Sequence, residues 1–308
     1  MRSADNKILV IGLRTGRLAN RLVLFANVIG FAAEHGHRVV NVAFHSYAHL
    51  FESTRRDIYC RYPVARHRSL FDVIPGMAPA IRKTRIFYQF IRQASEWNDR
   101  FPILGKSVFT LREVSSQTIL LDAPAVQSRM AGAKIVFVHG WRIRAPESVK
   151  RHAEKIRDYF RPVAGLEAAS RQVVGRLRQV AEVIIGVHLR RSDYRTWKQG
   201  QYFFPPERYA AWMRELAAQF PGRKTAFFAC SDEPRQASEF PGLAVVIGTG
   251  PPIVDLYALA GCDYILGPPS TFSQWASFYG NKPLYQLRSG DDRVERNKFR
   301  VSHLEEIP

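Results

Sequence analysis

Short apolar runs alternate with longer amphipathic stretches along most of this chain, and the alternation predicts strands and helices in turn. Residues 8–13 form an apolar run, residues 18–34 follow a helical period, and residues 39–43 are apolar again. Gly36 stands where the helix should end. This strand, loop, helix, strand order is typical of a parallel sheet with crossover helices.

The second half of the chain repeats this order more regularly. Its pattern predicts helices over residues 166–180, after Pro205-Pro206, and over residues 253–260 and 272–279. Strands are predicted between them, over residues 183–189, 225–229, 244–247, 264–266 and 284–287. We therefore expect an α/β protein of two halves with parallel sheets and a crevice between them, and ligands beyond the carboxyl ends of the strands.

The region before the second half is less uniform. Residues 119–122 and 134–139 are predicted strands, and residues 146–160 a charged helix. Arg161-Pro162 ends that helix because proline cannot continue it. This break predicts domains at 1–161 and 162–308. Residues 47–112 show no clear period, and we expect helices and long loops there.

The strongest candidate chemistry follows the predicted strand at 183–189. That strand runs directly into His188, Arg190, Arg191 and Asp193. Arginine presents a planar fork that matches phosphate oxygens in two-point contact, and it keeps its charge at any relevant pH. A strand end that merely meets water would suit one arginine, but it suits this whole set poorly.

Three other loops leave predicted strands with polar residues. Ser231-Asp232 follows one strand, Asp255 opens an apolar helix, and hydroxyl and amide groups begin the helix near residue 272. Helix N-termini bind anions, but ordinary capping also explains each of these loops. The hydroxyl-rich loop exceeds the needs of a cap. Its candidate residues are Ser270, Thr271, Phe272, Ser273 and Gln274.

The loop after the first strand carries Gly16, Arg17, Asn20 and Arg21. Its glycine spacing matches neither a Walker loop nor a dinucleotide fingerprint. No Asp-x-Asp pair occurs in the sequence, so a divalent cation clamp on a diphosphate has no obvious ligands. The chain also lacks the Gly-x-Ser-x-Gly and His-Glu-x-x-His motifs of hydrolases.

The charge balance indicates which class of partner the protein could bind. Lys and Arg outnumber Asp and Glu by 45 to 27, a formal net charge of +18. Such a surface favours nucleic acid, anionic lipid or phosphorylated small molecules. The arginines are dispersed and no known RNA-module signature is present, so we expect no nucleic-acid partner. The basic, aromatic stretch 82–92 could instead contact an anionic membrane, or simply cover the core.

Two further features bear on the compartment. The three cysteines share no metal-ligand spacing and form no disulfide framework, which favours a reducing environment. The apolar run 22–33 suits a buried helix and is too short to span a membrane. We expect a cytoplasmic protein, soluble or peripheral at the inner membrane surface.

The run His-Leu-Arg-Arg-Ser-Asp-Tyr at 188–194 resembles the His-x-Arg-Arg-x-Asp motif of the α-1,2- and α-1,6-fucosyltransferase superfamily. The tyrosine after the aspartate makes it most similar to bacterial α-1,2-fucosyltransferase-like proteins. Residues 16–21 are similar to the family's Gly-Gly-Leu-Gly-Asn-Gln element, and 228–232 to its strand-Ser-Asp element. Residues 255–266 and 270–275 resemble its C-terminal donor-binding segment. Residues 47–112 match no element of the family.

This resemblance implies a GT-B-like pair of Rossmann-type domains, with 1–161 on the acceptor side and 162–308 binding the donor. It implies an inverting glycosyltransferase that uses GDP-fucose or a related GDP-sugar as co-substrate, without metal or other cofactor. The acceptor would be a glycan, lipid-linked if the protein contacts a membrane. By position, Arg190 would bind the β-phosphate, and His188 and Asp255 the nucleoside. The other donor residues would be Ser231, Asp232, Ser270, Thr271, Phe272, Ser273 and Gln274, with Gly16, Arg17, Asn20 and Arg21 on the acceptor side.

Without a metal, fixed cations must stabilise the leaving diphosphate, which makes Arg190 and Arg191 catalytic candidates. Asp193 is a third, either as a base or as the carboxylate that orients an arginine; Glu207 is the other base candidate. Ala19 and Arg21 stand where the family has Gly and Gln. That departure makes GDP better supported than fucose. A non-catalytic nucleotide-binding protein and, less favoured, a nucleic-acid-binding protein stay as alternatives.

Overall fold

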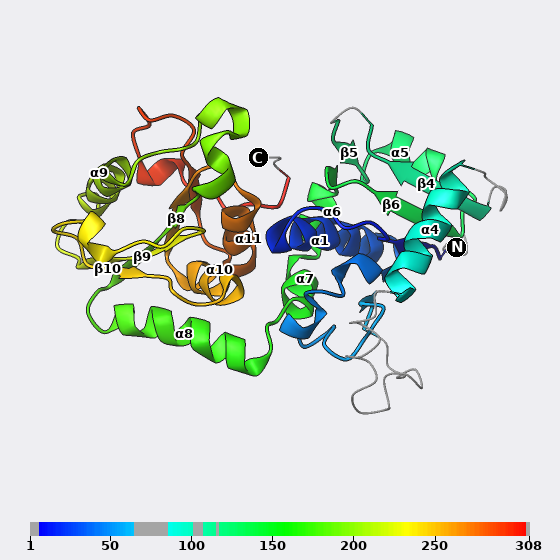
Figure 1. The fold of residues 1–308 in the computed structure, drawn as a ribbon, viewed down its shortest axis with the longest axis horizontal. Helices are drawn as coiled ribbons and strands as arrows, with labels where there is room; N and C mark the ends of the chain where they lie inside the picture. Colours follow the sequence, from blue (N-terminus) through cyan, green and yellow to red (C-terminus); the bar gives the residue numbers. More distant parts are fainter. Residues whose placement is uncertain (1–5, 65–85, 101–106, 115–116, 306–308) are drawn as a thin grey trace. The chain divides into compact units, whose positions relative to one another are not determined.

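The computed structural model describes residues 6–64, 86–100, 107–114 and 117–305. The chain forms two compact units, Met1–Val163 and Ala164–Pro308 (Figure 1). The division lies two residues from the Arg161-Pro162 break in the sequence.

The first unit is built on a five-stranded sheet in the order β3-β2-β1-β6-β4. Strands β1, β2, β6 and β4 are parallel, and β3 pairs antiparallel with β2 at the edge. A separate parallel pair, β5-β7, lies beside it. The strands are β1 (Ile8–Val10), β2 (Arg38–Val40), β3 (Arg61–Tyr62), β4 (Val108–Arg112), β5 (Ile119–Leu120), β6 (Ile135–His139) and β7 (Ile143–Arg144).

Helix α1 (Leu18–His35) is the buried helix of this unit. Its middle is apolar on every face and almost fully enclosed, and Gly36 ends it in the left-handed region at φ 68°. The buried Asn27 Oδ1 accepts a hydrogen bond from Ala145 N at 2.6 Å, so α1 is tied to the residue that directly precedes α6. The other helices in the described residues of this unit are α4 (Ile86–Arg100), α5 (Pro124–Arg129), α6 (Pro146–Arg151) and α7 (Ala153–Tyr159), with 3-10 turns η1 (Val42–Phe44) and η2 (Ala48–Leu50).

The second unit holds an entirely parallel five-stranded sheet in the order β10-β9-β8-β11-β12. Strand β8 lies at its centre and is buried along its whole length. Because the chain moves outward from β8 first on one side and then on the other, its topological switch point lies between β8 and β11. The strands are β8 (Val183–Leu189), β9 (Thr225–Ser231), β10 (Val245–Ile247), β11 (Tyr264–Gly267) and β12 (Leu284–Gln286).

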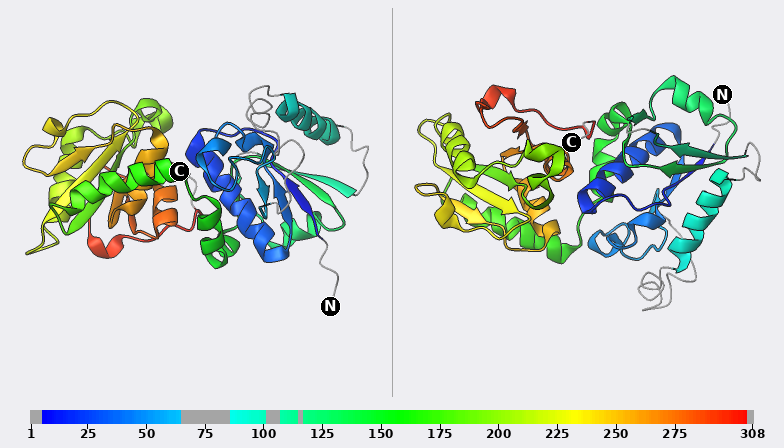
Figure 2. Two further views of the ribbon diagram at one scale, coloured as in Figure 1. Left: turned by 90° about the horizontal axis from the view of Figure 1, so that it is seen from below. Right: turned by 45° about the horizontal axis from the view of Figure 1, so that its top comes forward.

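Helices cover both faces of this sheet (Figures 1 and 2). Helix α9 (Pro206–Ala217) packs Tyr209, Trp212 and Met213 on one face, against alternate residues of β8. On the other face, a Cβ added at Gly186 would lie 2.6 Å from the Leu259 side chain, so this glycine permits a close approach of α10. That face carries α8 (Ala164–Arg178), α10 (Pro252–Gly261) and α11 (Thr271–Gly280).

The predicted elements of the second half are all present with small shifts at their ends. Two predictions for the first half are wrong. The region 47–112 contains β4, a full strand of the central sheet, where only helices and loops were expected. The predicted helix 146–160 is two helices, because the backbone at His152 leaves the helical region. Part of the basic stretch 82–92 lies outside the described residues, and the rest belongs to α4.

Candidate active site

The switch point of the second unit gathers most of the predicted donor residues. The segment after β8 and the loop between β11 and α11 leave neighbouring strands at the same edge of the sheet. A Cβ added at Gly267 would lie 3.0 Å from the Cβ of His188, so the two strands end in close contact. Crevices of this kind are where open α/β sheets bind ligands.

His188 is buried at the end of β8, with 3% of its surface exposed. Its ring lies 4.9 Å from the Phe272 ring, centroid to centroid. Burial, and then the positive charge of Arg190, lower the pKa of His188 to about 3. The imidazole is therefore neutral at physiological pH. Among the described residues its Nδ1 atom has no hydrogen-bond partner.

Arg190 is held between two carboxylates. Its Nη2 lies 2.5 Å from Asp193 Oδ1, and its Nη1 lies 2.9 Å from Asp232 Oδ2. Asp232 also accepts hydrogen bonds from the Arg191 backbone N–H at 2.8 Å and from the Ser192 hydroxyl. These bonds and Arg190 outweigh the effect of burial and lower the pKa of Asp232. Two loops are thereby tied together around one oriented guanidinium.

Arg191 makes a different set of contacts. Its Nη1 donates to the Phe204 carbonyl at 2.6 Å, and its guanidinium carbon lies 3.8 Å from the centre of the Phe203 ring. Its Nε lies 3.6 Å from Glu233 Oε2. Only 8% of the surface of Arg191 is exposed, and its guanidinium is bonded to groups within the second unit.

Glu233 is a structural residue that the sequence reasoning passed over. Its carboxylate forms ion pairs with Arg191, Arg195 and Arg235. Its backbone N–H donates to the hydroxyl of Ser231 at 3.2 Å. The feature of the sequence that could have indicated Glu233 is its position, as an acidic residue directly after Ser231-Asp232 at the end of a predicted strand.

The loop before α11 presents a helix N-terminus beside His188. Ser270 caps the helix, because its hydroxyl accepts a hydrogen bond from the Phe272 N–H at 3.2 Å. Ser273 donates to the Ser270 carbonyl at 3.2 Å, and Thr271 is 7% exposed. Gln274 is fully buried, and neither its amide oxygen nor its amide nitrogen has a hydrogen-bond partner in the described chain. An unpaired buried amide is costly and marks a place where a ligand or water can bond.

Asp255 lies at the neighbouring end of β10, in the first turn of α10. A Cβ added at Gly248 would be 2.7 Å from Asp255 Oδ1, so the loop after β10 passes directly over the carboxylate. Burial raises the pKa of Asp255 to about 6, and a hydrogen bond from the Gly250 backbone opposes this. Within the described ranges, Oδ1 has no hydrogen-bond partner. Burial, and then the charge of Asp255, raise the pKa of the Cys230 thiol on β9.

The four residues predicted on the acceptor side lie in the first unit. Gly16 has a φ of 57°, and a Cβ there would come within 2.1 Å of Asn20 Nδ2, so both the turn and the contact require glycine. Arg21 donates from Nε to the Gly16 carbonyl at 3.2 Å. Arg17 is exposed at the N-cap position of α1.

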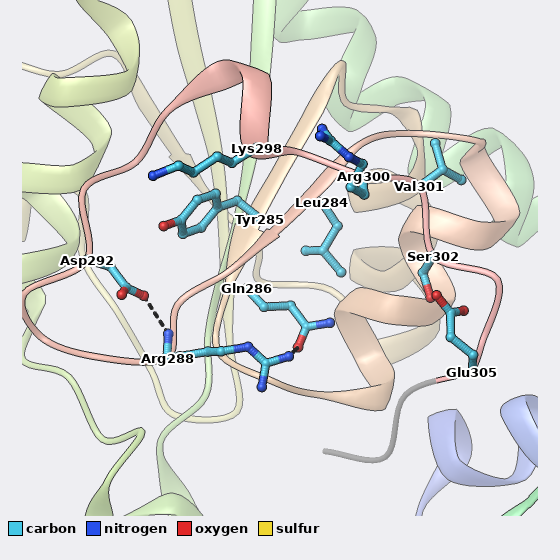
Figure 3. Close-up of a pocket in the computed structure, with 10 residues that line it drawn as sticks. All are labelled: Leu284, Tyr285, Gln286, Arg288, Asp292, Lys298, Arg300, Val301, Ser302 and Glu305. Carbon is cyan, nitrogen blue, oxygen red and sulfur yellow. Dashed lines mark hydrogen bonds between the residues drawn. The ribbon is translucent and has the colours of Figure 1, made fainter.

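A pocket of about 300 Å³ lies elsewhere in the second unit, beside β12 and the C-terminal segment (Figure 3). The backbone N–H of Arg288 donates to Asp292 Oδ2 across one side of it, at 2.6 Å. None of its lining residues is a predicted donor residue. They are Leu284, Tyr285, Gln286, Arg288, Asp292, Lys298, Arg300, Val301, Ser302 and Glu305.

The described residues lack two kinds of feature. They contain no group of three or more His, Cys, Asp or Glu side chains placed to hold a metal ion. None of the helices in the described ranges has the length and apolar character needed to cross a bilayer.

Comparisons with known proteins identify the fold. No family model matches the sequence, and no curated protein matches it. The structure is similar to an Arabidopsis thaliana FUT1 mutant in complex with GDP, with a TM-score of 0.58 and 13% identity over 95% of this chain and 72% of that chain. It is also similar to NodZ α-1,6-fucosyltransferase soaked with GDP-fucose (TM-score 0.52, 16% identity, 92% and 95% covered) and to POFUT1 in complex with GDP (0.51, 10%, 93% and 98%).

The fold is that of the GT-B fucosyltransferases. The match of residues 188–194 to the superfamily motif, the assignment to an α-1,2 subfamily and the individual site roles stay predictions.

Proposed function

We propose that this protein is an inverting, metal-independent glycosyltransferase that moves fucose or a related sugar from a GDP-sugar to a hydroxyl of a glycan acceptor. The observation that carries the proposal is the oriented Arg190 at the switch point, together with buried polar atoms of His188 and Gln274 that have no hydrogen-bond partner among the described residues. The structural neighbours crystallised with GDP or GDP-fucose support the same donor.

The second unit offers complementary groups for each part of GDP. The N-terminus of α11 and the guanidinium of Arg190 suit the diphosphate, because both present N–H donors and positive charge. The Asp255 carboxylate suits N–H or O–H donors of the nucleoside, since its Oδ1 is buried and has no hydrogen-bond partner in the described part of the chain. Binding such donors would favour the ionised carboxylate and draw its pKa down from about 6.

The reaction requires charge stabilisation on the leaving group. The acceptor oxygen forms a bond to the anomeric carbon while the bond from that carbon to the β-phosphate oxygen breaks. The electron pair leaves with the phosphate, which gives GDP, and the acceptor hydroxyl loses its proton. We assign Arg190 to the developing phosphate charge, and removing a fixed donor of this kind typically costs on the order of 100- to 1000-fold in rate.

Arg191 and Asp193 act by positioning other groups. Arg191 positions the strand end, because its guanidinium is taken up by Phe204 and Glu233. Asp193 forms an ion pair with Arg190, which favours orientation of the guanidinium over proton abstraction. The base is left unassigned.

Titration calorimetry of the purified protein in EDTA tests the donor site. GDP, GDP-fucose, GDP-mannose and UDP are compared at one ionic strength. We expect GDP and at least one GDP-sugar to bind at least tenfold more tightly than UDP. Arg190→Ala should lower GDP affinity by 10- to 100-fold, and Arg190→Lys should recover only part of it, because lysine keeps the charge and loses the planar fork.

Arg195→Ala is the matched control, since Arg195 is more exposed and pairs with Glu233 in the same segment. It should leave GDP affinity within about twofold. Unchanged GDP affinity in Arg190→Ala would overturn the assignment of Arg190. GDP binding without sugar transfer or donor hydrolysis would favour the non-catalytic alternative, and a requirement for added metal would overturn metal independence.

A further inference from the structure

The first unit has a switch point of its own. Its sheet order, β3-β2-β1-β6-β4, places the chain reversal between β1 and β6. Residues that follow β1 and β6 therefore share the carboxyl edge where such sheets bind ligands. Arg14 lies in the loop after β1, His139 ends β6, and Arg112 ends the neighbouring β4 directly beside His139.

Basic groups at this edge are packed against other basic or aromatic groups. Arg14 Nη2 lies 2.6 Å from His45 Nε2, and its guanidinium carbon lies 4.6 Å from the centre of the Tyr88 ring. Arg112 Nη2 lies 3.4 Å from His139 Nδ1. The neighbouring charge of Arg14 is one of the causes, after burial, that lower the pKa of Arg21.

Carboxylates do not balance the inner arginines. In the described part of the chain, Arg14 and Arg21 form no ion pair with Asp or Glu; Arg21 instead donates to the Ala43 carbonyl at 3.2 Å and the Ser46 hydroxyl at 2.9 Å. The nearby Glu113 is already engaged, because it accepts the backbone N–H groups of Trp141 and Arg142. This differs from the donor site, where Arg190 lies between two aspartates.

Several buried polar atoms at the edge also lack partners among the described residues. They are Arg14 Nε, Thr15 Oγ1 and His139 Nε2, and His139 is only 2% exposed. Burial, and then Arg112, lower the pKa of His139 to about 4, so its ring is neutral and can donate or accept one hydrogen bond. Partly buried arginines without counter-charge, stacked on an aromatic ring, form a preorganised receptor for an oxyanion.

We propose that the carboxyl edge of the first unit's sheet binds a negatively charged group of the acceptor, a phosphate or a carboxylate, through Arg14, Arg21 and Arg112. The acceptor is then an acidic or phosphorylated sugar chain. The assignment of this group to an acceptor rests on the proposed glycosyl transfer; the anion site itself does not. A neutral acceptor would leave Arg14 and Arg21 without a carboxylate or phosphate partner in the described part of the structure.

Titration calorimetry on the full chain tests the site, with GDP at saturation so that the donor site is occupied. The probes are glucose 1-phosphate, glucuronic acid and neutral glucose, all at one fixed ionic strength. At least one anionic probe should bind tenfold or more tightly than glucose. The stronger of the two identifies phosphate or carboxylate as the group selected.

Arg14→Gln should weaken binding of that probe at least tenfold and leave GDP affinity within twofold. Arg38→Gln is the matched control, because Arg38 is an exposed arginine of the same unit at the start of β2, on the opposite edge of the sheet. It removes the same charge and should change binding less than twofold. If Arg14→Gln fails to fold, as judged by circular dichroism, the exposed Arg112→Gln tests the same edge.

Equal binding of glucose and both anions would overturn the proposal, as would equal weakening by Arg14→Gln and Arg38→Gln. Repeating the titration without GDP separates the two proposals. If the protein binds no nucleotide but still binds the anion in an Arg14-dependent manner, the anion site is supported and the proposed glycosyltransferase function is contradicted.

Discussion

At the residue scale, the second unit carries buried polar groups whose hydrogen bonds the protein itself does not complete. Asp255 Oδ1 and both ends of the Gln274 amide have no partner in the described structure. Such groups reduce stability when water and ligand are both absent. Gln274 lies in the first turn of a helix that begins beside His188, and an unpaired amide there distinguishes a binding site from a set of helix caps.

Asp255 gives a test of this cost. Its pKa is raised to about 6 in the folded protein, against about 4 in an unfolded chain. The folded state therefore favours the protonated acid, and stability from this group is full below pH 4 and is lost as pH rises through 6. At neutral pH the ionised carboxylate costs about 3 kcal/mol. We expect Asp255→Asn to be more stable than the parent by up to that amount above pH 6.

Urea denaturation from pH 4 to pH 7.5 measures this difference. Groups shared by both proteins cancel, so the difference in free energy of unfolding should grow between pH 4 and pH 6 and then level off. A difference that does not vary with pH would contradict the assignment. GDP affinity should fall in the same variant, because the neutral amide replaces the carboxylate acceptor.

At the element scale, α4 differs from the other helices of the described ranges because it exposes large aromatic residues. Phe90 is 65% exposed and Trp97 is 69% exposed. Seven positions apart, they share one face of the helix. The net charge of +18 would bring the chain to an anionic bilayer, and aromatic side chains on an interfacial helix would hold it there. We therefore predict that α4 makes the peripheral contact with the membrane.

Co-sedimentation with vesicles of phosphatidylglycerol and phosphatidylcholine measures it. Replacing both Phe90 and Trp97 by Ser should lower the partition coefficient at least tenfold, since each buried aromatic contributes on the order of 2 kcal/mol. Val180→Ser is the control, because Val180 is also an exposed apolar residue, at 60%, but belongs to the second unit. Equal partitioning of the double variant and the parent would exclude a role for α4.

At the scale of the whole molecule, the two units have separate switch points with different charge environments. Among the described residues, Arg14 and Arg21 of the first unit have no carboxylate partner, whereas Arg190 of the second unit lies between two carboxylates. Under the proposed function, each unit then has its own ligand. A nucleotide should therefore affect the amide protection of one unit more than that of the other.

Hydrogen exchange with and without GDP checks this division. At a GDP concentration of 100 times Kd, binding stabilises the folded state by about 2.7 kcal/mol. Protection should increase in the segments after β8 and β11, within Ala164–Pro308, and much less in the loop after β1. Inorganic phosphate at the same concentration is the control. Equal protection of both switch points by GDP would contradict a donor site confined to the second unit.

Local patterns predicted most elements, because the hydrophobic period of a buried helix or strand is visible in a short run of consecutive residues. The match is closest for β8, predicted and observed at 183–189, since every one of its residues is buried. It fails for β4, where burial is mostly intermediate and the strand ends in Arg112. Such a strand carries little apolar signal, and only its pairing with β6 defines it.

The sequence by itself determined the α/β class, the candidate segment around Arg190 and the cationic character of the chain, because each depends on residue type and short spacing. Only the tertiary structure decided which partner each group has. Arg191 and Asp232 are 41 positions apart and bond because β8 and β9 are neighbours. The second carboxylate beside Arg190, that of Asp232, and the lack of described partners for the Gln274 amide follow from packing between distant segments, which no local pattern encodes.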